Sequence, residues 1–363
     1  MVYKGLKGVV CTETALSDID GERGHLIYRG YDAKDLAQNY SFEAIAHLLW
    51  YGHLPSEKEL MNLKEKFKLA REFPQFLKTI INEISEELDM LSVIRTAVSA
   101  YPLLSYEKPT IDDAIRLTSL IPAIIAYREA QLYEKIMPAV RQDLDHVAYY
   151  LYMIQGKEPD PSHVQALETY MILTMEHGLN ASTFSARVTA STESDLSSAI
   201  TSAIGTMKGP LHGGAPTGVI ELLDECANAN NIESLIRNKV LNGERLMGFG
   251  HRVYKTVDPR AEAIKQVLTK EKQNDDWFDL ALKVEEIAID VLEDLKPGRR
   301  LYTNVEYYAA AIMKELNIPS HLFTATFTAS RIVGWTAHVI EQLEDNTIFR
   351  PKAKYIGPVF SKY

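Results

Sequence analysis

The chain has 363 residues, of which 46% are hydrophobic and 24% are charged. This balance is typical of globular proteins and excludes a disordered chain, a collagen and a coiled-coil rod. The 49 acidic residues outnumber the 39 lysines and arginines, which leaves a net charge of -10. An overall attraction to nucleic acid or to anionic lipid is therefore not expected.

Features that report on the cellular compartment favour the cytoplasm. Only two cysteines are present, Cys11 and Cys226, which is too few for a disulfide framework in a chain of this length. The first ten residues lack the apolar segment of a signal peptide. One of the most apolar runs, residues 120–126, is far shorter than the roughly 20 residues that span a bilayer. We expect a cytoplasmic protein that binds neither membranes nor nucleic acid.

The one convincing strand signal lies near the N-terminus. Apolar and β-branched residues at 9–12 and 26–28 flank a turn-rich segment that contains Asp20 and Gly21. This pattern predicts a small N-terminal β-hairpin with a long loop.

The rest of the chain has the pattern of helices. Ser41 is a typical N-cap, and the helix that follows it is predicted to end at Gly52. Thr110 and Asp113 have the spacing of a capping box at the start of a long apolar helix. Apolar residues at helical spacing predict further helices at 162–177, 195–207, 216–227, 276–295 and 304–316. Strands and helices do not alternate, so we predict a mostly α protein rather than a parallel α/β fold.

Two histidines lie among residues that break helices. His212 lies in Gly-Pro-Leu-His-Gly-Gly-Ala-Pro, where the glycines leave room for a ligand beside the backbone. His251 is followed by Arg252, Lys255 and Arg260, and such a basic cluster in an acidic chain indicates an anionic ligand. On pattern alone, the first segment can also be a loop histidine bonded to backbone, and the second a solvated basic loop.

Two further segments have both a structural and a functional interpretation. Thr303 and Glu306 have capping-box spacing, so Glu306 is either a helix cap or a carboxylate base at a helix N-terminus. His177 precedes a glycine and can simply mark a helix end. Arg331 and Arg350 are single arginines that carry little meaning by themselves.

Several catalytic motifs are absent from the sequence. It contains no His-Glu-x-x-His and no Cys-x-x-Cys, so a zinc site is not expected. It also lacks the Gly-x-Ser-x-Gly elbow and the phosphate-binding loop of nucleotide hydrolases. Gly248-x-Gly250 lacks the third glycine and the preceding strand of a dinucleotide site, which argues against an NAD-linked oxidoreductase.

Taken in order, the motifs resemble those of the citrate synthase family, and the resemblance covers essentially the whole chain. The matching segments are His-x-Leu-Asn-Ala-Ser-Thr from His177, Gly-Pro-Leu-His-Gly-Gly-Ala around His212, Gly-x-Gly-His-Arg-Val-Tyr around His251, Asp-Pro-Arg ending at Arg260, Asn-Val-Glu ending at Glu306, Arg-x-x-Gly-Trp from Arg331 and Arg-Pro-x-Ala from Arg350.

The resemblance implies a homodimer with a nearly all-helical, two-domain fold. Residues 1–213 and 320–363 would form a large domain that dimerises and binds oxaloacetate. Residues 214–319 would form a small domain on the CoA side that closes over the substrates. The implied activity is condensation of acetyl-CoA with oxaloacetate, followed by hydrolysis of citryl-CoA, without a metal or a redox cofactor.

The resemblance also assigns roles to individual residues. The implied catalytic residues are His212, which donates to the thioester oxygen, His251, which acts on the ketone, and Glu306, which takes the methyl proton. Oxaloacetate would be bound by His177, Arg260, Arg331 and Arg350, the last from the partner subunit. CoA would be bound by Gly248, Gly250, Arg252 and Lys255. The family most often has aspartate where this chain has Glu306, a change that keeps the carboxylate.

Two alternatives stay open at this point. A 2-methylcitrate synthase would use propionyl-CoA, which differs by one methylene, and no motif separates it from a citrate synthase. A non-catalytic binding homologue is disfavoured because His212, His251 and an acid at position 306 are all present.

Overall fold

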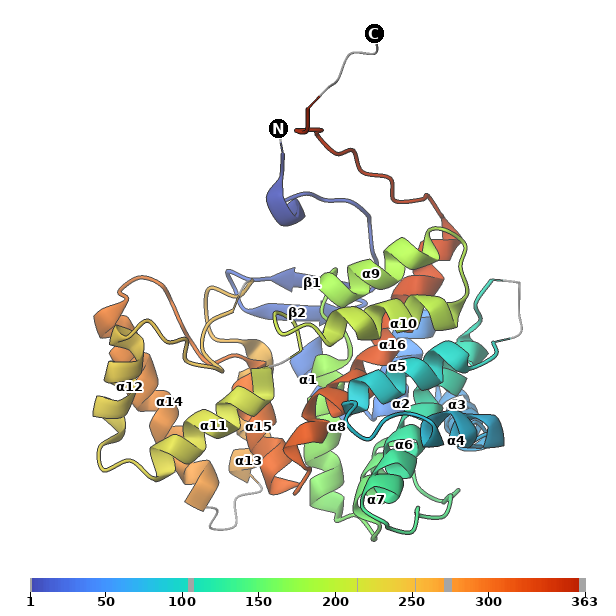
Figure 1. Ribbon diagram of the computed structural model, residues 1–363, viewed down its shortest axis with the longest axis horizontal. Coiled ribbons are helices and arrows are strands. Elements are labelled where there is room, and N and C mark those ends of the chain that lie inside the picture. Colours follow the sequence, from blue (N-terminus) through green and yellow to red (C-terminus); the bar gives the residue numbers. More distant parts are fainter. Residues whose placement is uncertain (1, 104–107, 214, 252, 271–275, 359–363) are drawn as a thin grey trace.

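A computed structural model describes residues 2–103, 108–213, 215–251, 253–270 and 276–358. The described residues contain sixteen α-helices, which confirms the predicted mostly α fold (Figure 1). Their bounds are α1 Ala33–Asn39, α2 Phe42–Tyr51, α3 Glu57–Leu69, α4 Gln75–Asn82, α5 Met90–Ala100, α6 Ile111–Leu132, α7 His146–Gln155, α8 Pro161–Met175, α9 Ala181–Ala190, α10 Leu196–Met207, α11 Ala215–Ala227, α12 Ile232–Leu241, α13 Pro259–Lys270, α14 Asp276–Leu295, α15 Val305–Glu315 and α16 Phe323–Glu344. Two short 3₁₀ helices cover Lys4–Leu6 and Ser320–Leu322.

The N-terminal sheet differs in part from the predicted hairpin. Its three antiparallel strands, in the order β1-β2-β3, are β1 Ser17–Asp20, β2 His25–Tyr28 and β3 Tyr31–Asp32. The prediction for residues 26–28 is confirmed, but the strand placed at 9–12 is wrong.

A tight turn, rather than the apolar character of residues 9–12, determines which segment pairs with β2. The carboxylate of Asp20 accepts the N–H groups of Glu22 and Arg23, at 3.0 and 2.9 Å, and so closes the turn directly after β1. Val10 is 88% exposed, so it does not pack against the rest of its own chain. The loop between the paired strands is therefore short.

Helix caps match the local sequence signals well. The hydroxyl of Ser41 accepts the Ala44 N–H, and α2 ends at Gly52 with a φ of 85°. Thr110 and Asp113 form the predicted capping box at the start of α6. α8 ends at Met175, two residues before the predicted end, because Glu176 has extended backbone angles. His177 is thereby placed in a loop.

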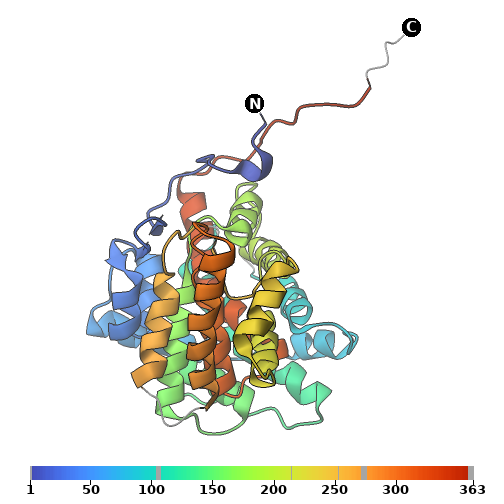
Figure 2. The same ribbon diagram turned by 90° about the vertical axis from the view of Figure 1, so that its left-hand side faces the viewer.

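The helices form two groups, one of which is a continuous part of the chain. α11, α12, α13, α14 and α15 contact one another and lie together at one end of the molecule (Figure 1). Figure 2 views the molecule from this end. α16 lies among the remaining helices and contacts α8, α9, α6 and α2. Its residues are buried on all sides along most of its length, as expected for the central helix of a core.

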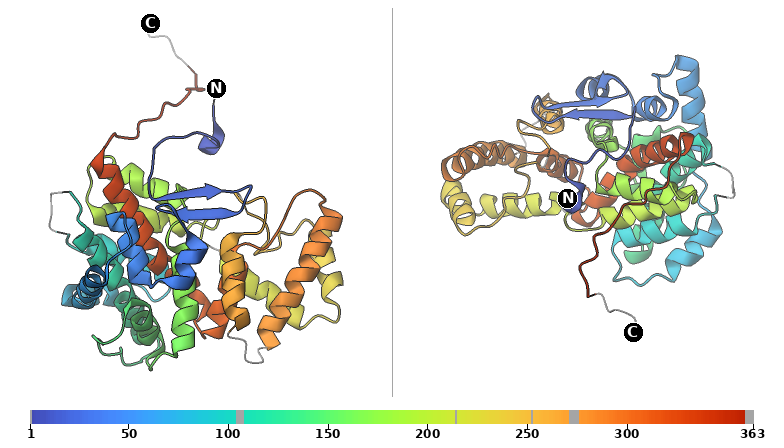
Figure 3. Two further views of the ribbon diagram at one scale, coloured as in Figure 1. Left: turned by 180° about the vertical axis from the view of Figure 1, so that it is seen from behind. Right: turned by 90° about the horizontal axis from the view of Figure 1, so that it is seen from above.

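The two terminal segments leave the body on the same side. The residues before Thr14 and those after Phe349 extend away from the packed helices (Figure 3). Thr14 itself donates to Glu341 of α16, and Phe349 packs on Phe184 of α9. Tyr355 and Ile356 in the C-terminal segment are 70% and 90% exposed. No described helix combines the length and the apolar character needed to cross a membrane.

Candidate active site

Two of the predicted histidines meet where the end of α8 faces the loop before α13. His177 Nε2 lies 3.1 Å from the hydroxyl oxygen of Tyr254. Its ring stands edge-on to that of His251, with the ring centroids 5.5 Å apart. Burial, together with the nearby charges of Arg260 and Arg331, holds the pKa of His177 well below its usual range. His177 is therefore a neutral hydrogen-bonding group in this site.

Hydrogen bonds fix the tautomer of His251. Its Nδ1 accepts the backbone N–H groups of Val253 and Tyr254, both at 3.1 Å, so the proton of the neutral ring lies on Nε2. Burial and the Arg260 charge lower the pKa of His251 to about 4. Arg260 Nη2 lies 3.4 Å from this Nε2. Two N–H donors thus lie side by side, and one acceptor oxygen in contact with both nitrogens would satisfy both.

One buried carboxylate positions Arg260 at the start of α13. Asp258 accepts the Arg260 Nε–H at 3.0 Å and the Nη2–H at 2.8 Å. Its Oδ2 also accepts the N–H of Val305, at 3.0 Å, at the start of α15. Burial would raise the pKa of Asp258, but the Arg260 charge holds it below its usual range. The carboxylate is therefore ionised and ties α13 to α15.

Arg331 on α16 supplies a second buried positive charge. It is 2% exposed, and its Nε donates to the carbonyl oxygen of Thr174 at 2.6 Å. Among the described residues, no carboxylate lies within ion-pair distance of its guanidinium. Glu176 attracts the Arg331 charge only from a longer distance, so the guanidinium has no carboxylate in direct contact. A ligand with carboxylate groups would provide one.

Glu306 does not act as the predicted helix cap. Asn304 is the N-cap of α15 and accepts the Glu306 N–H at 3.1 Å, whereas the Thr303 hydroxyl donates to Glu285. The capping-box interpretation is therefore wrong. Burial raises the pKa of Glu306 to about 7, although Arg260 and Arg331 act to lower it. This value suits a group that exchanges protons near neutral pH.

The orientation of His212 is set by Ser182, near the start of α9. His212 Nε2 lies 2.8 Å from the Ser182 hydroxyl, which also accepts the Trp335 Nε1–H at 3.0 Å. The Ser182 hydroxyl donates to Asn180 Oδ1 at 2.8 Å, an oxygen that also accepts the N–H groups of Ser182 and Thr183. The contact with Ser182 thus fixes the orientation of the His212 ring. Burial lowers the pKa of His212 to about 4, so the ring is neutral.

The two glycines predicted to bind CoA have a clear backbone role. Gly248 and Gly250 have φ values of 86° and 82°, a region that favours glycine. Their carbonyl oxygens accept the Asn304 backbone N–H and the Asn304 side-chain amide, each at 2.9 Å. A Cβ on Gly250 would lie 2.8 Å from Leu301. These glycines join the loop that contains His251 to the start of α15.

The other predicted CoA residues are less constrained. Lys255 is exposed, and its backbone N–H donates to the carbonyl oxygen of Gly21 at 2.8 Å, beside the N-terminal sheet. Arg252 lies outside the described residues. A role of either side chain in binding CoA stays a prediction.

Arg350 does not reach this site within one chain. It is exposed and lies in the C-terminal segment that extends away from α16 (Figures 1 and 3). The structure thus brings together six predicted residues around one region but leaves Arg350 apart. Those six are His177, His212, His251, Arg260, Glu306 and Arg331.

Three positioning residues were not assigned a role from the sequence. Ser182, Tyr254 and Asp258 all lie inside the family-like motifs, yet their contacts are made with residues distant in sequence or across a turn. For Asp258 a local signal existed, because an aspartate directly before Pro-Arg is a typical N-cap. For Ser182 and Tyr254 the sequence offered none.

A family model described as citrate synthase, C-terminal domain, matches residues 5–352. The chain belongs to the citrate synthase family. Citrate synthase 2 of Bacillus subtilis (strain 168) is 39% identical, over 99% of this chain and 97% of that protein. The 2-methylcitrate synthase of Shewanella oneidensis is 38% identical, over 97% of this chain and 94% of that protein.

The fold agrees with solved structures of citrate synthases. The citrate synthase of Thermoplasma acidophilum, in a ternary complex with carboxymethyl coenzyme A and oxaloacetate, has a TM-score of 0.90. It is 32% identical, and the match covers 100% of this chain and 98% of that one. These matches confirm the resemblance seen in the sequence, and the chain is an enzyme of the citrate synthase family.

Proposed function

We propose that this chain condenses acetyl-CoA with oxaloacetate and then hydrolyses citryl-CoA to citrate and CoA. The observation that carries the proposal is the pair of buried guanidiniums, Arg260 and Arg331, beside a carboxylate whose pKa is raised to about 7, Glu306. Such a site binds an anionic substrate and holds a base beside it. The ternary complex of the Thermoplasma relative, which contains oxaloacetate and a CoA analogue, supports the same substrates here.

Oxaloacetate would occupy the space between the buried donors. The planar guanidiniums of Arg260 and Arg331 suit carboxylates because each can donate two parallel hydrogen bonds. His177, neutral and 3.1 Å from the Tyr254 hydroxyl, would donate or accept one more. Arg350 would complete the site from a second copy of the chain, whose extended C-terminal segment could reach it. The active unit is then a homodimer.

Glu306 would begin the reaction by removing a methyl proton from acetyl-CoA. The thioester oxygen becomes an enolate oxygen, and the imidazole of His212 would donate a hydrogen bond to it. A donor placed at developing negative charge contributes about 3–4 kcal/mol in comparable sites. Because His212 is neutral, it stabilises the enolate without protonating it outright.

His251 would complete the condensation. The enolate carbon attacks the ketone carbon of oxaloacetate, and the ketone oxygen becomes an alkoxide that takes the Nε2 proton of His251. The tautomer fixed by Val253 and Tyr254 places that proton on the correct nitrogen. Glu306 then releases the methyl proton to solvent, and His251 regains a proton from solvent. Water then attacks the thioester of citryl-CoA and releases CoA as the thiol. The condensation uses side chains and the hydrolysis uses water, so we propose that no cofactor is needed.

The two groups of helices suggest how the site excludes water. We propose that 214–319 form the smaller domain, with 1–213 and 320–363 as the larger one, and that closure brings Lys255 and Arg252 to the CoA phosphates. Closure would delay hydrolysis until citryl-CoA has formed.

Cys11 and Cys226 are both free thiols, in keeping with the cytoplasm as the proposed compartment.

The second candidate is a 2-methylcitrate synthase, which would take propionyl-CoA. It is favoured by the 38% identity to the Shewanella oneidensis enzyme, which nearly equals the 39% identity to the Bacillus subtilis citrate synthase. One methylene changes selectivity in an apolar pocket by only about 1–3 kcal/mol. Both thioesters are therefore reasonable substrates at some rate.

The test is the release of free CoA thiol from each thioester, with and without oxaloacetate. Oxaloacetate-dependent release from acetyl-CoA, with the higher kcat/KM, is the expected result. A higher kcat/KM with propionyl-CoA would select the 2-methylcitrate reaction. No release from either thioester would refute the proposed chemistry.

A further inference from the structure

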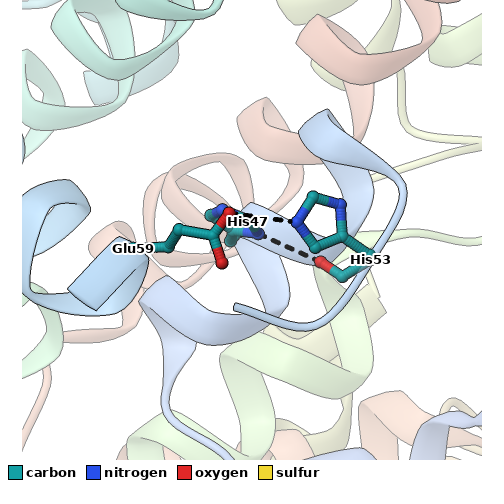
Figure 4. A group of neighbouring side chains, drawn as sticks. All are labelled: His47, His53 and Glu59. Carbon is teal, nitrogen blue, oxygen red and sulfur yellow. Dashed lines mark hydrogen bonds and ion pairs between the residues drawn. The ribbon is translucent and has the colours of Figure 1, made fainter. Parts of the chain in front are cut away.

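Two histidines and a glutamate come together at the junction of α2 and α3. His47 lies on α2, His53 lies in the loop that follows, and Glu59 lies in the first turn of α3 (Figure 4). Each offers one ligand atom, and these three atoms lie within 4.8 Å of one another. None of the three belongs to the active site described above.

Both rings have their proton on Nδ1. His47 Nδ1 lies 3.0 Å from the carbonyl oxygen of His53, and His53 Nδ1 lies 3.3 Å from the carbonyl oxygen of Tyr51. A carbonyl oxygen only accepts, so both Nδ1 atoms must donate. This leaves a bare lone pair on each neutral Nε2. Histidines that bind metals are oriented in this way, by donating their second N–H to a carbonyl or carboxylate.

One contact in the cluster requires a positive charge. His53 Nε2 lies 3.3 Å from Glu59 Oε1, so a lone pair faces a carboxylate oxygen. The other oxygen of Glu59 is occupied, because it accepts the N–H and the hydroxyl of Ser56 at 2.8 and 2.7 Å. Either a proton or a metal ion must lie between Nε2 and Oε1.

The separation of the two rings fits a metal ion. Zn²⁺ bound to an imidazole nitrogen at about 2.0–2.1 Å lies about 3.2 Å from the ring centroid, so two rings at a tetrahedral angle have centroids about 5.2 Å apart. The centroids of His47 and His53 are 5.0 Å apart, and the rings are inclined by 83°. His47 is held in place by stacking on Tyr51, at a centroid distance of 4.4 Å.

We propose that His47, His53 and Glu59 bind one divalent cation of the zinc class, with water in the remaining position. Two nitrogen ligands and a single carboxylate favour Zn²⁺ over Mg²⁺ or Ca²⁺, which prefer oxygen ligands. The ion would join the end of α2 to the start of α3, on either side of the loop that contains His53. Its effect is structural, since the chemistry of the active site uses none of these groups.

The experiment is a zinc titration of the full-length chain after removal of metals with a chelator. Calorimetry is expected to show one Zn²⁺ per chain, and the thermal unfolding midpoint is expected to rise with zinc concentration. Mg²⁺ at the same concentration should change neither. His53→Ala removes an exposed ligand and should weaken zinc binding at least tenfold. Glu59→Gln, which keeps the capping box, should also weaken it.

The matched control is His321→Ala. His321 Nε2 lies 2.8 Å from Glu129 Oε1, so this variant also loses a histidine–carboxylate pair, but without a second histidine beside it. It should keep zinc binding unchanged. The proposal is overturned if the wild-type chain binds no zinc, if His53→Ala binds it as tightly as wild type, or if His321→Ala loses as much affinity. Circular dichroism on each variant shows that any loss is not due to unfolding.

Discussion

Asp258 accepts hydrogen bonds from Arg260 with both carboxylate oxygens, at 3.0 and 2.8 Å, and also accepts the N–H of Val305 at 3.0 Å. One buried side chain thus fixes an arginine proposed to bind substrate and the first residue of the helix that contains Glu306. The distance between the anion-binding group and the base therefore depends on Asp258. Arg260 and the backbone of Val305, the residue before Glu306, are both hydrogen-bonded to it.

Replacing Asp258 by Asn should damage both substrate binding and turnover. The variant keeps the shape but leaves the Arg260 charge without its partner, and breaking a buried pair costs about 3–5 kcal/mol. We expect a lower thermal midpoint, a higher KM for oxaloacetate and a lower kcat. Steady-state kinetics and thermal unfolding measure all three. Unchanged KM and kcat would show that Asp258 does not position the site.

Glu306→Gln tests the proposed base. It removes the proton acceptor but keeps the size of the side chain, and general base catalysis contributes about 10²–10⁴-fold. We expect kcat to fall by at least about 10²-fold, while oxaloacetate affinity measured by calorimetry stays near the wild-type value. Glu306→Asp should retain part of the activity. An equal loss of oxaloacetate affinity in Glu306→Gln would indicate that the residue binds substrate or holds the helix instead.

The pKa of Glu306 can be measured in the free enzyme. Burial raises it from 4.5 to about 7, so the folded state holds this proton more tightly than the unfolded chain does. The contribution of Glu306 to stability is therefore lost as pH rises from about 4.5 to 7, and the active, ionised base forms over the same range. Carbon-13 NMR of labelled glutamates should show a carboxyl that titrates near pH 7 and is absent from Glu306→Gln. Titration of that signal near pH 4.5 would contradict the prediction.

Local signals explain which features the sequence could predict. Ser41 and Thr110 cap the helices that they were expected to cap, because an N-cap bonds within its own first turn. Thr303 and Glu306 have the same spacing, yet Thr303 instead donates to Glu285, eighteen residues away in sequence. A tertiary partner thus overrode a local motif, and no window of sequence around Glu306 contains that information.

The residues that orient the histidines are likewise distant in sequence, so local patterns do not predict them. His212 was identified from its glycine-rich loop, but its orientation depends on Ser182, thirty residues earlier. The His47, His53 and Glu59 cluster was not anticipated, since its spacing matches none of the zinc motifs considered. Its geometry depends on the turn between α2 and α3 that brings the three together.

Arg331→Leu should weaken oxaloacetate binding without lowering the thermal stability of the protein. The Arg331 guanidinium is buried and has no carboxylate partner among the described residues, so removing its charge takes away a cost in the free protein. Losing its charged hydrogen bonds to substrate should cost about 1.5–3 kcal/mol, or roughly ten- to a hundredfold in the KM for oxaloacetate. We expect that increase in KM with a thermal midpoint equal to or above that of wild type. Arg331→Lys, which keeps a charge, should have an intermediate KM, and a wild-type KM in Arg331→Leu would exclude Arg331 from substrate binding.

His338 should hold the His177 loop through Glu176. The buried Glu176 Oε1 accepts the His338 Nε2–H at 2.9 Å and the Gly178 N–H at 2.6 Å, while His338 Nδ1 accepts the Arg187 Nε–H at 2.9 Å. His338→Ala leaves buried groups without partners, which costs about 1–3 kcal/mol each.

We therefore expect a lower urea midpoint for His338→Ala and, because the His177 loop loosens, a higher KM for oxaloacetate with a smaller change in kcat. His338→Gln can still donate to Glu176 and should recover most of the KM. If His338→Ala loses stability but keeps the wild-type KM, the network supports the fold alone. The recovery of KM by Gln, rather than the loss of stability, is what a positioning role requires.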